Sequence, residues 1–355
     1  MSSLLELAPF SLAHSEKQRI FVSEIKDLTR FHMDRCESYR NILSRNRIVP
    51  QIIQSVEQVP FLPVRLFKHI DLLSVGRGEV VKTITSSGTT GEAVSRVFLD
   101  KETSVHQIRS LVKILQDFIG IQRMPMLIID HPNVIKNRVS FSARGAGILG
   151  LSNFGIDHTY GLQDETMELD FEKIQAFLDR HHGKPILIFG FTFMVWAYFV
   201  RALESCNRKI DLSKGILLHS GGWKKLQDES VDNVTFKARV KDVTGIGRVH
   251  NFYGMAEQVG TVYVECEQGR LHAPVFSDVV IRDPFDWKPL GIGEEGLIQV
   301  LSILPRSYPG HSLLTEDVGE ISGIDDCPCG RLGKTILIRG RIAKAEVRGC
   351  SDTQS

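Results

Sequence analysis

The chain has 355 residues, of which 42% are hydrophobic and 24% are charged. This balance is typical of a folded globular protein and excludes a disordered or fibrous chain. Lys and Arg number 43 against 42 for Asp and Glu, so the net field gives no electrostatic reason to expect nucleic acid as a partner. A small-molecule ligand is favoured instead.

The N-terminal residues and the apolar runs argue against secretion and membrane insertion. The first residues contain Glu6 and lack a basic start followed by a long apolar stretch. The longest apolar candidate, 186–202, contains Gly190 and Thr192 and is better interpreted as a buried strand followed by a helix. We therefore expect a cytoplasmic protein with no membrane span, in which the six cysteines are thiols, metal ligands or a nucleophile and do not form a disulfide framework.

The predicted elements change in kind along the chain. Residues 1–75 have apolar residues at three- and four-residue spacing, which predicts a helical N-terminal segment. Residues 76–265 alternate β-rich runs, such as PILIFG and GILLHS, with amphipathic stretches, which predicts an α/β core with a largely parallel, helix-covered sheet. Residues 266–340 contain mainly β runs and predict a smaller β-rich subdomain, and a short tail, 341–355, follows.

A loop of small residues follows the β run EVVKTIT. Glycines let a backbone turn tightly and bring N–H groups close to an anion, while Ser and Thr hydroxyls add donors. The loop is not a Walker loop, because Gly91 is followed by Glu92 and Ala93. Composition alone also suits an ordinary turn, but the order of residues after a strand favours phosphate binding. The predicted phosphate-binding residues are Thr85, Ser86, Ser87, Gly88, Thr89, Thr90 and Gly91.

This loop resembles the phosphate loop of the adenylate-forming superfamily, which includes acyl-CoA ligases, firefly luciferase and peptide-synthetase adenylation domains. Further motifs of that superfamily have matches downstream in the same order: Ser220-Gly221-Gly222 after a strand, Asn251 to Glu257 for its Tyr-Gly-x-x-Glu segment, Thr315-Glu316-Asp317 for its Thr-Gly-Asp, and Gly340-Arg341. The resemblance implies the α/β large-domain fold of these enzymes, without their mobile C-terminal domain, and implies ATP and Mg²⁺ as cofactors.

The resemblance also implies a role for each matching residue. Glu257 would hold Mg²⁺ against ATP with a hard carboxylate oxygen. Asp317 would accept hydrogen bonds from the ribose hydroxyls, and Arg341 would reach the ribose or phosphates. Taken singly, each is equally well a surface or turn residue, so the assignment depends on the ordered set. The implied adenine-side residues are Ser220, Gly221, Gly222, Asn251, Phe252, Tyr253, Gly254 and Met255.

Two segments, 137–148 and 346–350, resemble the acyl-protein synthetases of bacterial luminescence. Those enzymes activate a fatty acid with ATP, move the acyl group to a cysteine of their own near the C-terminus, and deliver it to a partner reductase. The resemblance implies a long-chain fatty acid as the carboxylic acid substrate, Cys350 as acyl acceptor, and a reductase-like acyl-accepting partner protein. The alternative enzyme is an acyl- or aryl-CoA ligase or a carrier-protein ligase with the same adenylation step; the non-enzyme alternative is an adenylate-binding module without turnover.

Four further residues form a candidate metal site. Three thiols and one imidazole fit tetrahedral zinc, and four protein ligands would leave no open position for catalysis, which indicates a structural site. The spacing is not that of a common zinc finger, although related aryl-CoA ligases have similar cysteine patterns. The alternative is that these are four unconnected turn residues. The candidate ligands are Cys266, His272, Cys327 and Cys329.

Overall fold

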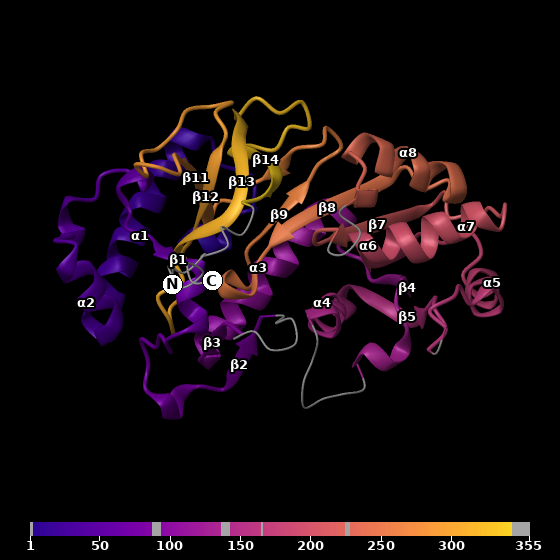
Figure 1. Cartoon of the computed structure of the whole chain (residues 1–355), viewed down its shortest axis with the longest axis horizontal. Coiled ribbons are helices and arrows are strands. Elements are labelled where there is room, and N and C mark those ends of the chain that lie inside the picture. Colours follow the sequence, from indigo (N-terminus) through magenta and orange to yellow (C-terminus); the bar gives the residue numbers. More distant parts are fainter. Residues whose placement is uncertain (1–2, 87–93, 136–142, 165, 224–227, 343–355) are drawn as a thin grey trace, which may run out of the picture. The chain divides into compact units, whose positions relative to one another are not determined.

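The computed structural model describes the chain except residues 1–2, 87–93, 136–142, 165, 224–227 and 343–355 (Figure 1). The chain divides into two compact units. The first unit comprises Met1–Ile84, Ser95–His106 and Ala273–Ser355, and the second comprises Thr85–Val94 and Gln107–His272. The first unit therefore takes residues from both ends of the chain. The boundaries predicted at residues 75, 265 and 340 stay predictions.

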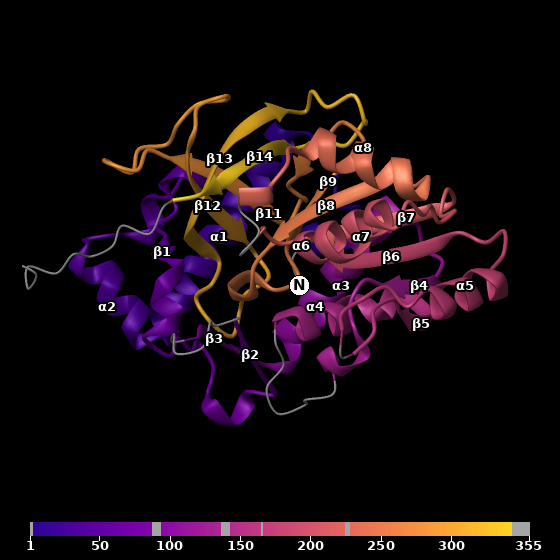
Figure 2. The same ribbon diagram turned by 45° about the vertical axis from the view of Figure 1, so that its right-hand side comes forward.

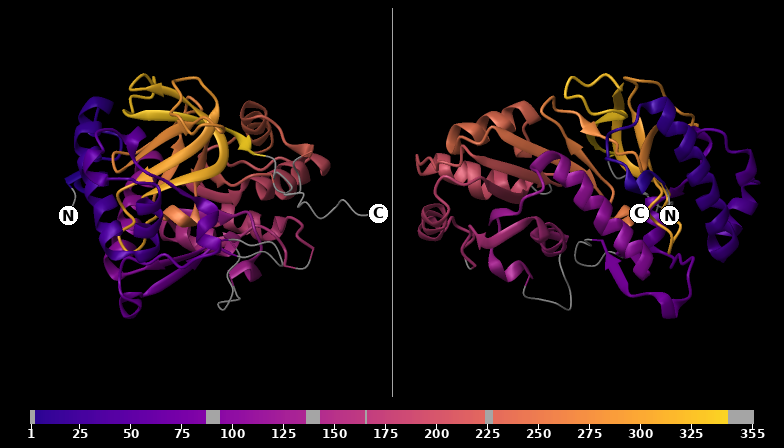
Figure 3. Two further views of the ribbon diagram at one scale, coloured as in Figure 1. Left: turned by 60° about the vertical axis from the view of Figure 1, so that its left-hand side comes forward. Right: turned by 180° about the vertical axis from the view of Figure 1, so that it is seen from behind.

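The first unit combines N-terminal helices with antiparallel strands. Helix α1 buries Phe21, Ile25, Leu28 and His32, and this spacing of three and four residues places all of them on one helical face. In both views of Figure 3 the indigo helices lie beside the orange-to-yellow strands, in the order β11-β12-β13-β14. The elements are α1 (His14–Arg35), α2 (Glu37–Arg45), β1 (Leu62–Pro63), β3 (Arg96–Leu99), β11 (Ser277–Arg282), β12 (Gly296–Ser302), β13 (Ser312–Ile324) and β14 (Lys334–Arg341). Strand β2 (Lys82–Thr85), paired with β3, and helix α3 (Lys101–Ile119) begin in this unit.

The second unit is built on a mainly parallel sheet covered by helices, with the strand order β9-β8-β7-β6-β4-β5 (Figure 2). Strand β7 is buried along its whole length, which explains its almost uninterrupted apolar sequence, because a strand covered on both faces does not alternate. The strands are β4 (Met124–Ile128), β5 (Gly155–Tyr160), β6 (Ile186–Phe191), β7 (Gly215–Ser220), β8 (Arg248–Gly254), β9 (Val262–Glu265) and β10 (Leu271–His272). The helices are α4 (Ala143–Leu151), α5 (Phe171–Arg180), α6 (Thr192–Val195), α7 (Arg201–Ser205) and α8 (Asn233–Thr244).

The apolar run at 186–202 forms a strand followed by a helix, as predicted. Strand β6 leads into α6, a π-helical stretch at Trp196–Val200, and α7. Trp196, Phe199 and Val200 belong to the hydrophobic core between these helices and the sheet. Among the described residues, no helix is long and apolar enough to cross a membrane. The predicted α/β class is confirmed.

Candidate active site

The carboxyl ends of three parallel strands bring the predicted nucleotide-side residues of the second unit together. Phe191 at the end of β6 is paired in register with Ser220 at the end of β7, and Ser220 is paired with Phe252 in β8. The segment Asn251–Met255 thus lies at the same sheet edge as Ser220. This edge is where ligands bind in open parallel sheets.

The turn after β7 depends on glycine. Gly221 has φ +81°, a left-handed conformation that side-chain-bearing residues rarely adopt, and a Cβ on it would lie 3.1 Å from Cδ1 of Phe191. The carbonyl of Ser220 accepts a hydrogen bond from the Thr192 hydroxyl at 3.1 Å. Gly222 has open space around its Cα. The turn is therefore fixed at Ser220 and Gly221 by β6 and α6.

His219, just before this turn, lies in an aromatic cluster. Its Nδ1 is 3.0 Å from the Thr192 hydroxyl, and its ring centroid is 4.6 Å from that of Phe236 in α8. Burial and the nearby Lys237 ammonium lower the pKa of His219 to about 3. The imidazole is therefore neutral at pH 7 and is part of the core under the turn.

The segment 251–257 combines a strand end with a short 3-10 turn, Ala256–Gln258. Tyr253 faces Tyr263 across the β8–β9 pair, with ring centroids 6.0 Å apart. Glu257 is only 7% exposed. A buried carboxylate is uncommon. The alternative considered from sequence, that Glu257 is a solvated surface residue, is therefore wrong.

Asp317 and Arg341, both in the first unit, are neighbours. They are paired in register across β13 and β14, and Nε of Arg341 donates to Oδ1 of Asp317 at 3.0 Å. The backbone N–H of Asp317 donates to the Thr315 hydroxyl at 3.1 Å. Because Arg341 is 68% exposed, this ion pair contributes little to stability. Its significance is that two residues predicted to contact the ribose are adjacent.

The predicted phosphate loop lies only partly within the residues that the structure describes. Thr85 ends β2 and Ser86 follows it, but Ser87, Gly88, Thr89, Thr90 and Gly91 lie outside the described residues. The candidate acyl acceptor Cys350 also lies outside them. Their roles stay predictions.

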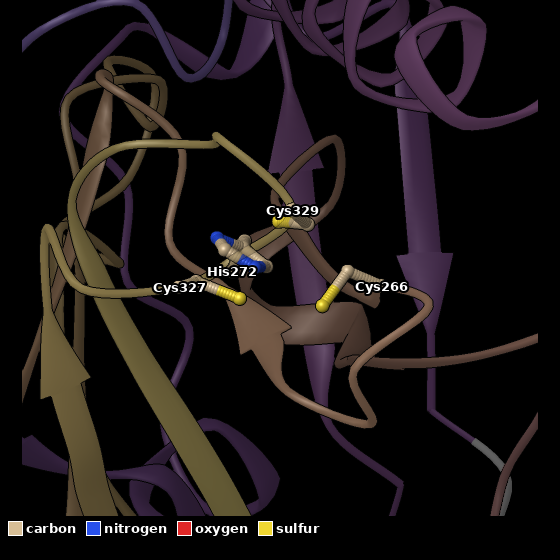
Figure 4. A group of neighbouring side chains, drawn as sticks. All are labelled: Cys266, His272, Cys327 and Cys329. Atoms are coloured by element: carbon tan, nitrogen blue, oxygen red, sulfur yellow. The ribbon is translucent and has the colours of Figure 1, made fainter.

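The four candidate metal ligands are close together (Figure 4). Sγ atoms of Cys266, Cys327 and Cys329 and a ring nitrogen of His272 all lie within 4.8 Å of one another. These cysteines do not form disulfide bonds with other described residues. The turn after Cys266 and the turn after Cys327 each end at a glycine with positive φ, Gly269 at 76° and Gly330 at 83°. The backbone nitrogen of Gln268 lies 3.4 Å from Cys266 Sγ. An N–H directed at sulfur favours the thiolate form that a metal requires, so the donor set fits a tetrahedral metal ion.

One buried residue near the site was not identified from the sequence. Glu265, at the end of β9, is 1% exposed, and its carboxylate accepts a hydrogen bond from the backbone N–H of Asn251 at 3.1 Å. The signal available was a charged residue inside the apolar run TVYVEC, because a carboxylate in a buried strand requires dedicated partners.

The sequence is similar over almost its whole length to one protein family. Residues 2–355 match the family described as acyl-protein synthetase, LuxE. The chain is 25% identical over 354 residues to the long-chain-fatty-acid–luciferin-component ligase of Aliivibrio fischeri, covering 97% of this chain and 90% of that protein. The ligase of the same name from Vibrio harveyi is 22% identical over 351 residues, with 96% and 88% covered.

The fold is similar to that of solved ligases. An open conformation of 2-hydroxyisobutyryl-CoA ligase, in complex with 2-HIB-AMP and CoA, has a TM-score of 0.70 at 15% identity, covering 95% of this chain and 77% of that chain. The same ligase in the thioesterification state also gives a TM-score of 0.70, at 16% identity, covering 95% of this chain and 70% of that chain. The predicted adenylate-forming α/β fold is thereby confirmed.

Proposed function

The chain belongs to the acyl-protein synthetase family, and from this we propose that it uses ATP to activate a long-chain fatty acid as its acyl-adenylate. We further propose that the acyl group passes to Cys350 and then to a reductase-like partner protein. The observation that carries the proposal is the family match over residues 2–355. The positions of Ser220 and Asn251–Met255 at one sheet edge support it.

In the first half-reaction, a carboxylate oxygen of the acid attacks the α-phosphorus of ATP and pyrophosphate leaves. Both reactants are anionic, so positioning and charge neutralisation are the main requirements. Mg²⁺, when bound, would supply much of that neutralisation, and Glu257 is the residue proposed to hold it. The loop 85–91 would bind the phosphates, the turn 220–222 and segment 251–255 would flank adenine, and Asp317 with Arg341 would bind the ribose.

In the second half-reaction, the thiolate of Cys350 attacks the carbonyl carbon of the acyl-adenylate and AMP leaves. The product is a thioester, which retains enough activation for transfer to a partner. The acceptor distinguishes this proposal from a coenzyme A or carrier-protein ligase, which would deliver the same acyl group to a different thiol.

We also propose that Cys266, His272, Cys327 and Cys329 hold one zinc ion. The donor set and the closeness of the four ligand atoms support a tetrahedral site. With four protein ligands the ion would stabilise the turns that carry them and would have no open position for substrate. Its role is therefore structural.

Acid-dependent exchange of labelled pyrophosphate into ATP tests the adenylation step. We expect exchange with long-chain fatty acids and little with short acids or with no acid. Absence of exchange across a panel of carboxylic acids would mean that the chain binds a nucleotide without turnover or has another activity.

A further inference from the structure

A buried carboxylate links helix α8 to the strand that carries Asn251. The side chain of Glu265 is 2% exposed and receives three N–H donors. Nζ of Lys237 lies 2.8 Å from Oε1, and Nδ2 of Asn233 donates to the same oxygen. The backbone N–H of Asn251 donates to Oε2 at 3.1 Å. The two carboxylate oxygens thus contact different elements, α8 and β8.

The backbone of Glu265 strengthens this link. Its carbonyl oxygen lies 2.8 Å from Nδ1 of His250, the residue before Asn251. The next residues of β8, Phe252 to Gly254, are paired in antiparallel register with Val264 to Val262 of β9. Glu265 therefore contacts two successive residues of β8 immediately before the segment that leads to Glu257.

A carboxylate in this position is costly unless it is fully paired. Removal of an ionised group from water carries a large penalty, which only an opposite charge and well-directed hydrogen bonds offset. Those partners are available only when α8 and Asn251 have the arrangement seen here. The same requirement fixes the position of the Asn251 backbone relative to α8.

We propose that Glu265 is a positioning residue of the nucleotide site, which holds the segment Asn251–Met255 in place through the Asn251 backbone. The inference rests on the proposed function, because that function assigns the segment to the adenine side of ATP. Glu265 acts through Asn251 and has no direct part in the chemistry. Its loss should therefore weaken nucleotide binding more than acid binding.

The substitution Glu265→Gln tests this role. Glutamine has nearly the same volume, but it has no charge, and its amide N–H₂ would face one of the present donors. In the pyrophosphate-exchange assay we expect the KM for ATP to rise about tenfold, the size of effect expected from one hydrogen bond to a charged group. The KM for the fatty acid should stay close to the wild-type value.

Glu204→Gln is the matched control. Glu204 in α7 pairs with Arg239 of α8, and among the described residues its carboxylate makes no hydrogen bond or ion pair with β8. Glu204→Gln therefore removes a charged partner of α8 and should leave the KM for ATP unchanged. Zinc content should be measured in both variants, because Cys266 follows Glu265 directly.

A second variant covers the case in which Glu265→Gln fails to fold. Glu265→Gln combined with Lys237→Met removes both charges of the ion pair, so that no buried charge is left without its partner. We expect this variant to fold, to retain zinc, and to show a raised KM for ATP with an unchanged KM for the acid.

Three outcomes would overturn the inference. The first is a wild-type KM for ATP in Glu265→Gln or, if that variant does not fold, in the double variant. The second is an equal rise in both KM values, and the third is an effect of the same size in Glu204→Gln. Absence of exchange in the wild-type protein would instead overturn the proposed function, and this inference with it, so the two failures are distinguishable.

Discussion

At the scale of single residues, the sheet edge in the second unit contains a buried carboxylate, a left-handed glycine and a threonine with two polar contacts. Glu257 is a buried carboxylate, and Gly221 has a left-handed backbone beside the Phe191 ring. Thr192 contacts both His219 and the Ser220 carbonyl. Of these features, the buried carboxylate of Glu257 is the one that an ordinary turn does not require.

Glu257→Gln should abolish pyrophosphate exchange while the protein stays folded. The amide keeps the shape of the carboxylate but lacks the charge proposed to hold Mg²⁺, so we expect a loss of about a hundredfold or more, as for other groups that stabilise transition-state charge. Exchange rates and circular dichroism measure the two effects. Glu172→Gln, at an exposed position of α5, should behave as wild type. Near-normal exchange in Glu257→Gln would refute the assignment.

Gly221→Ala should destabilise the second unit, because Gly221 has φ +81° and its new Cβ would lie 3.1 Å from Phe191. A non-glycine residue in this conformation costs about 1–2 kcal/mol. Gly222→Ala is the matched control, since a Cβ there meets no atom within 4 Å. Urea unfolding of the two variants gives the comparison. Equal stability would show that the turn adjusts without cost.

At the scale of secondary-structure elements, the apolar pattern was enough to predict much of the fold. Strands β6 and β7 are continuous apolar runs, and a run of that kind has few alternatives to a buried strand. Strand β13 could not be predicted in the same way, because it contains the polar stretch TEDVGE and is a strand through its pairing with β12 and β14.

The candidate site was predicted to a similar extent. The motifs at Ser220 and Asn251 were found from sequence because they resemble, in the same order, motifs of the adenylate-forming superfamily. Glu265 was missed because its importance comes from α8 and β8, which are brought to it by the fold. The pairing of Asp317 with Arg341 likewise depends on the register of β13 and β14, which sequence spacing does not give.

The proposed zinc site, formed by the turns that carry Cys266, His272, Cys327 and Cys329, can be tested by metal analysis. Metal analysis of purified protein should find about one zinc ion per chain, as a single tetrahedral site requires. Cys327→Ser should lower both zinc content and melting temperature, because the remaining ligands of the group lose one partner. Cys206→Ser replaces an exposed thiol outside the group and should change neither. Metal-free wild-type protein that is folded and active would refute the zinc proposal.

At the scale of the whole molecule, buried neutral histidines make stability depend on pH. Burial lowers the pKa of His311 to about 3, and burial with the Lys237 charge lowers the pKa of His219 to about 3. Both side chains are nearly inaccessible to solvent. In the unfolded chain each imidazole regains the usual pKa of about 6.5.

Stability should therefore fall as the pH is lowered from about 6.5 towards 3. In that range the unfolded chain binds protons that the folded protein does not, and the loss is at most about 1.4 kcal/mol per pH unit for each histidine. Melting temperatures measured between pH 7 and pH 5 check the direction. His311→Gln, which does not titrate, should reduce the slope. A melting temperature that rises towards pH 5 would contradict this account.

The acyl group is proposed to pass from the ATP-activated acid to Cys350 and then to a partner protein. Wild-type protein incubated with ATP and labelled fatty acid should retain label through denaturation and lose it to neutral hydroxylamine, which cleaves thioesters. Cys350→Ser should still catalyse pyrophosphate exchange, because the proposed nucleotide residues are unchanged, but it should retain no label. Label on coenzyme A, or label that persists on Cys350→Ser protein, would contradict the claim.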